Sequence, residues 1–292
     1  MTPLALAVDI GGTKVAVGLV AADGTLKERT RAATPAGSSI LQTVFELARP
    51  LAEQAVICGI GTAGTVDPRG RITSATELLT GWAGTDVKGA AQRALMLPTV
   101  VLNDCHAAGV AEARVGSARD ASTALVVAVG TGIGGAVCVA GRVRTGLSGT
   151  AGSIGHLPAP TSAGVPCSCG ALDHIEAHAS GPAIERAYRE ETGQALPLAE
   201  IGRLGSHVIT DAATLLGRVL AGAANLVDPD AIVIAGGVSM LGPALFGPLE
   251  AAYRADALPG PSAAPLLPAR LGGDAGLVGA GLEALSRLEN RS

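Results

Sequence analysis

The fold of this chain is decided by one stretch near its start, Leu6-Ala-Val-Asp-Ile-Gly-Gly-Thr-Lys14. Its apolar residues are typical of a short buried strand, and the two glycines that follow permit a tight turn. Apolar residues resume at 15–20, and Asp23-Gly24 is a hairpin signal before a third strand over 25–30. An antiparallel start of this kind differs from the strand-then-helix opening of a dinucleotide-binding fold.

The same pattern of strand, glycine turn and strand returns at 124–139, around Gly130-Thr-Gly-Ile-Gly-Gly135. Such a recurrence suggests two related halves, and the remaining segments alternate in type. We therefore predict an α/β protein of two lobes with a cleft between them. The predicted helices are 39–54, 86–95, 107–115, 175–191, 210–226 and 277–289, and the further strands are 56–61, 99–102 and 231–235.

Amino-acid composition and net charge argue against several classes of protein. The 292 residues are 48 % hydrophobic, enough for a substantial core, and the net charge of −4 without a basic cluster argues against a nucleic-acid partner. Residues 121–141 and 231–249 carry no charge and are long enough to span a bilayer. Their glycines and short β-branched runs favour strands, so we expect no membrane partner. Five cysteines without a secretory signal predict a cytoplasmic protein.

Both glycine turns suit phosphate groups. Backbone N–H groups of such a turn approach an anion closely, and Thr13 and Lys14 add a hydroxyl donor and a charge. Asp9, at the end of its strand, is a candidate holder of Mg²⁺. The second turn formally matches GxGxxG, yet no acidic residue lies between Asp120 and Asp173, which disfavours NAD. An ordinary hairpin turn remains the alternative at the first site.

Asn103-Asp104 follows the predicted strand over 99–102. A carboxylate at that end of a strand is well placed to accept a hydroxyl proton as a general base. The alternative is a helix N-cap for residues 107–115.

A loop rich in glycine, proline and cysteine contains the third candidate site. His156, Cys167, Cys169 and His174 supply four ligands, enough to close a tetrahedral zinc site of structural type. Thiols without a metal are the alternative. The nearby His174-Ile-Glu-Ala-His178 is not a metalloprotease signature, because its glutamate does not directly follow the first histidine.

Together, these motifs in this order resemble the ROK family (repressors, open reading frames, kinases), whose sugar kinases have the actin-like, hexokinase-type ATPase fold with a duplicated ribonuclease H-like motif. The resemblance covers essentially the whole chain. It includes residues 6–14, Gly61-Thr-Ala-Gly-Thr-Val-Asp67, Leu102-Asn-Asp104, Val129-Gly-Thr-Gly-Ile-Gly-Gly135, Gly155-His156 with the Cys-x-Cys-Gly loop, and Ile234-Ala-Gly-Gly-Val238. Family repressors carry a helix-turn-helix domain before this core, and we expect none here because the first strand begins at Leu4.

The resemblance implies an ATP-dependent sugar 6-kinase that uses Mg²⁺ and a structural zinc ion. It implies a small lobe over 1–105, completed by a helix over 277–292, a larger lobe over 106–276 with a zinc loop over 150–176, and a homodimer or homotetramer. Asp104 would be the base. The implied nucleotide contacts are Asp9, Gly11, Gly12, Thr13, Lys14, Thr131, Gly132, Gly134, Gly236 and Gly237, and the implied sugar contacts are Gly64, Asn103, Asp104, Ser153, His156 and Glu176.

Two departures from the family pattern matter. His174 stands where the family has its last zinc-binding cysteine, and Asp173 replaces a glycine. Ser153 stands where family glucokinases have a glutamate at the C1/C2 end of the sugar, as in bacterial N-acetylmannosamine kinases, so the smaller side chain favours a 2-acetamido sugar. The alternatives are a glucokinase, a non-catalytic sugar-sensing ROK protein, and an interaction protein with a structural zinc loop.

Overall fold

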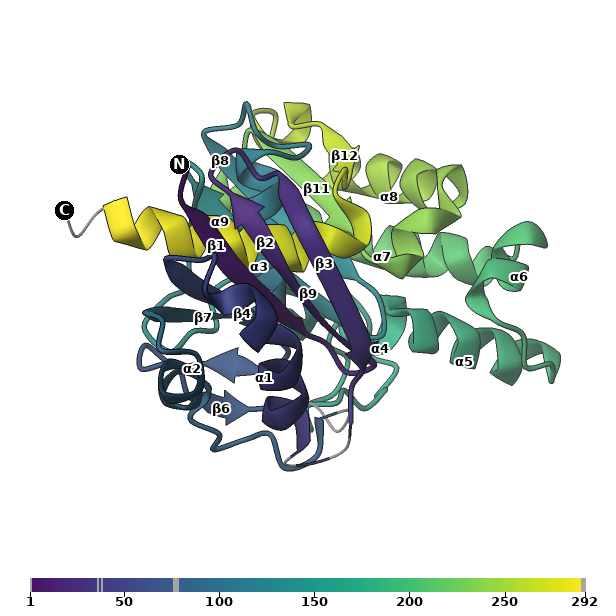
Figure 1. Cartoon of the computed structure of the whole chain (residues 1–292). Helices are drawn as coiled ribbons and strands as arrows, with labels where there is room; N and C mark the ends of the chain where they lie inside the picture. Colours follow the sequence, from purple (N-terminus) through teal and green to yellow (C-terminus); the bar gives the residue numbers. More distant parts are fainter. Residues whose placement is uncertain (1, 36, 38, 76–78, 290–292) are drawn as a thin grey trace. The chain divides into compact units, whose positions relative to one another are not determined.

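A computed structural model describes residues 2–35, 37, 39–75 and 79–289 of the chain (Figure 1). Within these residues, the strands form two five-stranded sheets, one from the first part of the chain and one from the second, together with a small two-stranded sheet. Each glycine turn joins the first two strands of a five-stranded sheet, as the recurrence of the pattern predicts. The elements up to residue 114 are β1 (Leu4–Ile10), β2 (Lys14–Ala21), β3 (Leu26–Ala33), α1 (Ser39–Ala52), β4 (Ile57–Thr62), β5 (Thr65–Val66), β6 (Ile72–Ser74), α2 (Val87–Leu95), β7 (Thr99–Asn103) and α3 (Asp104–Arg114).

The remaining elements begin with three strands, as the first part of the chain does, and end with a helix. They are β8 (Thr123–Val129), β9 (Ile133–Val139), β10 (Arg142–Arg144), the short 3₁₀ helix η2 (Ile154–His156), α4 (Glu176–Ala179), α5 (Gly181–Thr192), α6 (Leu198–Arg203), α7 (His207–Val227), β11 (Ala231–Ala235), the 3₁₀ helix η3 (Gly237–Leu241), α8 (Pro243–Asp256), the 3₁₀ helix η4 (Pro261–Ala263), β12 (Leu266–Pro268), the 3₁₀ helix η5 (Gly272–Asp274) and α9 (Ala275–Glu289).

The two larger sheets have the same topology. The first has the strand order β3-β2-β1-β4-β7, and the second has the order β10-β9-β8-β11-β12. In the first sheet, β1 pairs antiparallel with β2 and parallel with β4. In the second sheet, β8 pairs antiparallel with β9 and parallel with β11. This confirms the duplicated α/β unit that the two glycine turns predict.

The chain divides into two compact units. The first takes in residues 1–119, 141–151 and 271–292, and the second takes in 120–140 and 152–270. The first unit therefore extends past the boundary expected after residue 105. The physical reason is α3, which packs along α9 and against β4 and β7 of the first sheet.

Successive side chains of β1 lie on opposite faces of the first sheet. Leu6, Val8 and Ile10 pack with residues of α1 and α2, whereas Ala7 packs with residues of α3 and α9. Successive side chains of a strand point to opposite faces, so Asp9 shares the α3 and α9 face with Ala7. Helix α9, yellow in Figure 1, runs across β1 and β2 on that face.

Small residues let α9 approach closely. A Cβ on Gly59 of β4 would lie 2.0 Å from the Ala280 carbonyl oxygen, and one on Gly279 would lie 1.7 Å from that of Ala107. Only glycine fits such contacts between backbones. Helix α9 is thereby held close to β4 and to α3.

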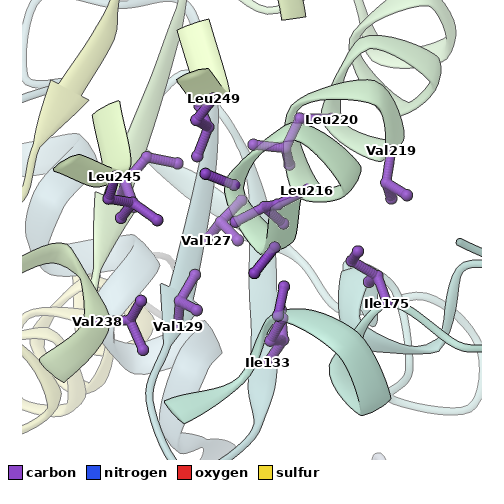
Figure 2. Packing of buried hydrophobic residues seen from close by; sticks show 14 of the residues in the cluster. Val127, Val129, Ile133, Ile175, Leu216, Val219, Leu220, Val238, Leu245 and Leu249 are labelled. Carbon is purple, nitrogen blue, oxygen red and sulfur yellow. The ribbon is translucent and has the colours of Figure 1, made fainter. Parts of the chain in front are cut away.

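Aliphatic side chains from β8, α7 and α8 pack together in the core of the second unit (Figure 2). Val127 and Val129 of β8 meet Leu216 and Leu220 of α7 and Leu245 of α8, and all five side chains are almost completely buried. The predicted helix over 175–191 is two helices, because Ser180 caps α5 by accepting from the Ala183 N–H before Pro182. No helix among the described residues is long and apolar enough to cross a bilayer.

Candidate functional site

In the first unit, the turn after β1 is closed by its own backbone. The Gly11 N–H donates to the Lys14 carbonyl over 3.0 Å, and the Thr34 hydroxyl donates to the Gly11 carbonyl over 2.7 Å. Thr13 and Lys14 are exposed. The backbone of the turn is therefore held by hydrogen bonds at Gly11, while the Thr13 hydroxyl and the Lys14 ammonium group face solvent.

Asp9 lies beneath this turn in a crowded, acidic environment. A Cβ on Gly276, at the start of α9, would lie 2.9 Å from the Asp9 carboxylate, so only glycine leaves it room there. The pKa of Asp9 is raised from 3.8 to about 6, mainly by burial and then by the charge of Asp104, while the charge of Lys14 opposes the shift. Two neighbouring carboxylates that resist ionisation together are a favourable place for a divalent cation.

Asn103 and Asp104 join β7 to α3. The Asn103 Oδ1 accepts from the N–H groups of Cys105 (2.9 Å) and His106 (3.2 Å), and its Nδ2 donates to the Gly64 carbonyl over 3.0 Å. The predicted helix cap is therefore Asn103, and the helix begins at Asp104. Burial raises the pKa of Asp104. A carboxylate that gains a proton readily, held by a capped helix start, has the properties of a general base.

The raised pKa of Asp9 gives a stability prediction. The carboxyl binds its proton more tightly in the folded chain, so stability falls as pH rises from about 4 to about 6 and the full cost, at most about 3 kcal/mol, is present above pH 6. We expect Asp9→Asn to raise the Tm at pH 8, without Mg²⁺ or nucleotide, and to leave it nearly unchanged at pH 4. Thermal unfolding at both pH values measures this.

Asp23→Asn is the matched control for this prediction. Asp23 is exposed in the same unit, and hydrogen bonds from Thr25 lower its pKa, so its replacement should bring no gain at pH 8. A lower Tm for Asp9→Asn than for the wild type at pH 8 would contradict the account of Asp9.

In the second unit, the corresponding turn is held by Glu176 of α4. The Gly130 N–H donates to the Gly132 carbonyl over 2.8 Å, and the Ile133 N–H donates to the Glu176 Oε2 over 2.8 Å. A Cβ on Gly132 would lie 2.5 Å from that carboxylate oxygen. The Glu176 Oε1 accepts from the Ser168 hydroxyl over 2.6 Å. Glu176 therefore links the second glycine turn to the cysteine loop.

Gly236 follows β11 beside this turn. Its φ is +89°, and a Cβ there would lie 2.2 Å from the Val129 carbonyl oxygen, so the position requires glycine. The Gly181 N–H, at the start of α5, donates to the Gly130 carbonyl over 2.8 Å. The structure thus brings Gly236 and Gly237 to the same strand ends as Thr131, Gly132 and Gly134.

The segment with Ser153 packs on β9. Cβ atoms on Gly152 and Gly155 would lie 2.7 Å and 2.0 Å from the carbonyl oxygens of Gly135 and Ile133. Ser153 and His156 are exposed, while Ile154 is buried between them. Close backbone packing therefore fixes the two polar side chains at the surface of the second unit.

The four predicted zinc ligands come together. One ligand atom from each of His156, Cys167, Cys169 and His174 lies within 4.8 Å of the others. The Cys167 Sγ is 3.7 Å from the His156 Nδ1, and the Cys169 Sγ is 3.2 Å from the His174 Nδ1. Tetrahedral zinc separates a sulfur and a nitrogen ligand by about 3.5 Å. The donor set and its spacing fit zinc, and His174 occupies the position of the fourth ligand.

Asp173 explains the other departure from the family pattern. Its φ is +54°, a left-handed conformation that asparagine and aspartate adopt more readily than other non-glycine residues. Its carboxylate accepts from the N–H groups of Gly164 (2.8 Å) and Val165 (2.9 Å) and lies 3.0 Å from the His178 Nε2. An aspartate can therefore replace the glycine and also order the loop.

We expect close to one zinc ion per chain in protein purified without a chelator. Cys167→Ala should remove the metal and lower the Tm and the sugar affinity together, because His156 belongs to both the metal cluster and the implied sugar contacts. Cys138→Ala, at a buried cysteine of β9, is the control and should retain zinc. Elemental analysis and calorimetry measure these outcomes, and full sugar affinity without zinc would contradict them.

The predicted site residues thus form two groups, one in each unit. The first unit holds Asp9, Gly11, Gly12, Thr13, Lys14, Gly64, Asn103 and Asp104, and the second holds Thr131, Gly132, Gly134, Ser153, His156, Cys167, Cys169, His174, Glu176, Gly236 and Gly237. The sequence reasoning missed Gly276 and Ser168. Three glycines within the last helix, at 276, 279 and 281, were the available signal for the close approach to Asp9.

Comparisons with known proteins show which family and which proteins this chain is similar to. The model of a family described as the ROK family matches residues 5–286. A glucokinase from Streptomyces coelicolor is 30 % identical over 307 residues, covering 95 % of this chain and 96 % of the relative. An N-acetylmannosamine kinase from Escherichia fergusonii is 32 % identical over 292 residues, covering 95 % and 97 %. The crystal structure of a ROK family glucokinase from Streptomyces griseus, in complex with glucose and AMPPNP, is 31 % identical with a TM-score of 0.83, covering 97 % of this chain and 99 % of that chain.

Proposed function

Because the chain belongs to the ROK family, we propose that this sugar kinase transfers the γ-phosphoryl group of ATP to the 6-hydroxyl group of N-acetylmannosamine. The observation that carries the choice of sugar is Ser153, exposed on a segment whose backbone is fixed by Gly152 and Gly155. Relatives of nearly equal identity are named glucokinase and N-acetylmannosamine kinase, so identity alone does not choose between the sugars.

Asp104 is the proposed general base. Its carboxyl has a raised pKa and stands at the start of α3, so it can accept the proton of the sugar 6-hydroxyl as the oxygen attacks phosphorus. Asn103 holds the start of α3, where Asp104 lies, in place. Its side chain caps α3 and donates a hydrogen bond to the Gly64 carbonyl. The proton transfer makes the hydroxyl oxygen a better nucleophile at the moment of bond formation.

The glycine turns are the proposed phosphate sites. Charge develops on the γ-phosphoryl oxygens during transfer, and backbone N–H groups together with the Lys14 ammonium group stabilise it. Mg²⁺, when bound, would neutralise phosphate charge, and Asp9 is the residue that would hold it. Gly236 and Gly237 leave room for the adenosine of the nucleotide, because no side chain intervenes there.

Ser153 distinguishes the proposed substrate from glucose. Both sugars present the same 6-hydroxyl, so the choice depends on the C1/C2 end. A carboxylate there would accept a hydrogen bond from a glucose hydroxyl but would lose solvation beside an acetamido methyl group. Serine carries no charge, so its hydroxyl offers a glucose hydroxyl only a neutral, weaker hydrogen bond. Ala151 and Ile154 flank it in sequence and are apolar.

Two alternatives remain as outcomes of one experiment. A glucokinase is favoured by the glucokinase relatives, and a non-catalytic sugar sensor is disfavoured by the presence of Asp104 and Lys14. The test is ADP release by the wild-type protein with ATP, Mg²⁺ and a panel of hexoses and 2-acetamido hexoses. We expect kcat/KM to be highest for N-acetylmannosamine. A preference for glucose of tenfold or more supports the glucokinase. If none of the sugars in the panel causes ADP release, the non-catalytic sensor is supported.

A further inference from the structure

The chain passes from one unit to the other four times, after residues 119, 140, 151 and 270. On the first-unit side of these passages lie the segment 115–119, Gly141, Ala151 and Leu271. All four belong to the same unit as α3, and α3 side chains bond to each of them. The helix that begins at Asp104 is therefore connected to every passage.

Glu112 bonds to two of the four passages. Its side chain is completely buried, its Oε1 accepts from the Leu271 N–H over 2.9 Å, and its Oε2 accepts from the Ser117 N–H over 2.8 Å. A Cβ on Gly116 would lie 2.1 Å from the same carboxylate, so glycine is required beside it. One carboxylate thus fixes the backbone after α3 and the backbone before α9.

His106 and Arg114 bond to the other two. The His106 Nε2 lies 2.8 Å from the Ala151 carbonyl oxygen, and the ring is almost completely buried. Burial lowers the pKa of His106, so the neutral ring donates this bond at neutral pH. The Arg114 Nε donates to the Gly141 carbonyl over 2.7 Å. Ala151 immediately precedes the segment that contains Ser153 and His156.

We propose that Glu112 and His106 are positioning residues for phosphoryl transfer. They hold the backbone at the points where the chain leaves the first unit, and so fix the position of these points relative to Asp104, the base at the start of the same helix. The inference rests on the proposed function, since it takes Asp104 as the base. A misplacement of about 1 Å between reacting groups can lower a rate by about 100-fold, so bonds that fix these distances affect kcat.

The first arm of the test compares Glu112→Gln with the wild type. An amide keeps one acceptor oxygen but presents an NH₂ group to the second N–H donor, so one of the two bonds is lost. We expect hydrogen exchange at Ser117 or Leu271 to become faster and kcat to fall by about tenfold or more, with KM for ATP within about threefold of wild type. Val44→Ala, in α1 on the opposite face of the first sheet, is the control that loses stability without touching α3.

The second arm concerns His106. His106→Leu removes the donor to Ala151, and we expect KM for the sugar to rise by about tenfold, because the segment with Ser153 begins there. His106→Gln places an N–H group near the position of Nε2 and should restore KM to within about threefold of wild type. This arm stays informative if Glu112→Gln does not fold.

The outcomes separate the two proposals. Wild-type protein that phosphorylates neither N-acetylmannosamine nor glucose overturns the proposed function. Unchanged exchange at both Ser117 and Leu271 in Glu112→Gln overturns the positioning role, and so does a kcat within threefold of the Val44→Ala control. A KM for His106→Leu equal to that of the wild type overturns the part assigned to His106.

Discussion

Asp104→Asn is expected to lower kcat by about 10²–10⁴-fold, the contribution of a general base, while sugar affinity stays near that of the wild type. The amide keeps the size of the side chain but cannot accept the proton of the 6-hydroxyl. Folding should be preserved, because burial raises the pKa of Asp104 and the neutral amide avoids the cost of an ionised carboxylate in that position. Steady-state kinetics, sugar titration and thermal unfolding at pH 8 measure the three properties.

Asp86→Asn is the matched control for this loss of a carboxylate. Asp86 caps α2 in the same unit by accepting from the Gly89 N–H, and asparagine is an equally good cap. Its kcat should equal that of the wild type. If Asp104→Asn retained a kcat within tenfold of the control, the base would be another residue.

Ser153→Glu is expected to change the ratio of kcat/KM for N-acetylmannosamine to that for glucose by about tenfold to 100-fold in favour of glucose. A hydrogen bond to a charged acceptor contributes about 1.5–3 kcal/mol, which corresponds to that range. Ser153 is exposed in the second unit, so the larger side chain should be accommodated without loss of the fold. Kinetics with both sugars, at saturating ATP, measure the ratio.

The control for this variant adds the same charge elsewhere. Ser162 is exposed in the second unit and outside the implied sugar contacts, and Ser162→Glu should leave the ratio unchanged. An equal ratio in Ser153→Glu and the wild type would show that Ser153 does not choose the sugar.

The sheets and the cluster of four candidate zinc ligands were predictable from the sequence because their signals are local. A strand, a glycine turn and a second strand occur within about fifteen residues, and the repetition of this pattern indicates the duplicated unit. His174 was predictable as a ligand because imidazole and thiolate both bind zinc. The structure adds that Asp173 adopts a φ of +54° beside it, which the residue type alone does not reveal.

Residues that act through the backbone of distant segments were not predictable. Glu112 is separated from Leu271 by 159 positions, and no pattern in α3 indicates a buried carboxylate with that partner. The raised pKa of Asp9 depends on the approach of Gly276 and on Asp104, both remote in sequence. The break between α4 and α5 was within reach, since Gly181-Pro182 is a helix-start signal.

We propose that this chain phosphorylates the 6-hydroxyl group of N-acetylmannosamine. The test is a competition reaction in which the wild-type protein, ATP and Mg²⁺ are combined with equal concentrations of N-acetylmannosamine and glucose. The products are identified by phosphorus-31 NMR correlated to the sugar protons. We expect N-acetylmannosamine 6-phosphate as the main early product. Glucose 6-phosphate in excess, or a phosphate on another hydroxyl, would contradict it.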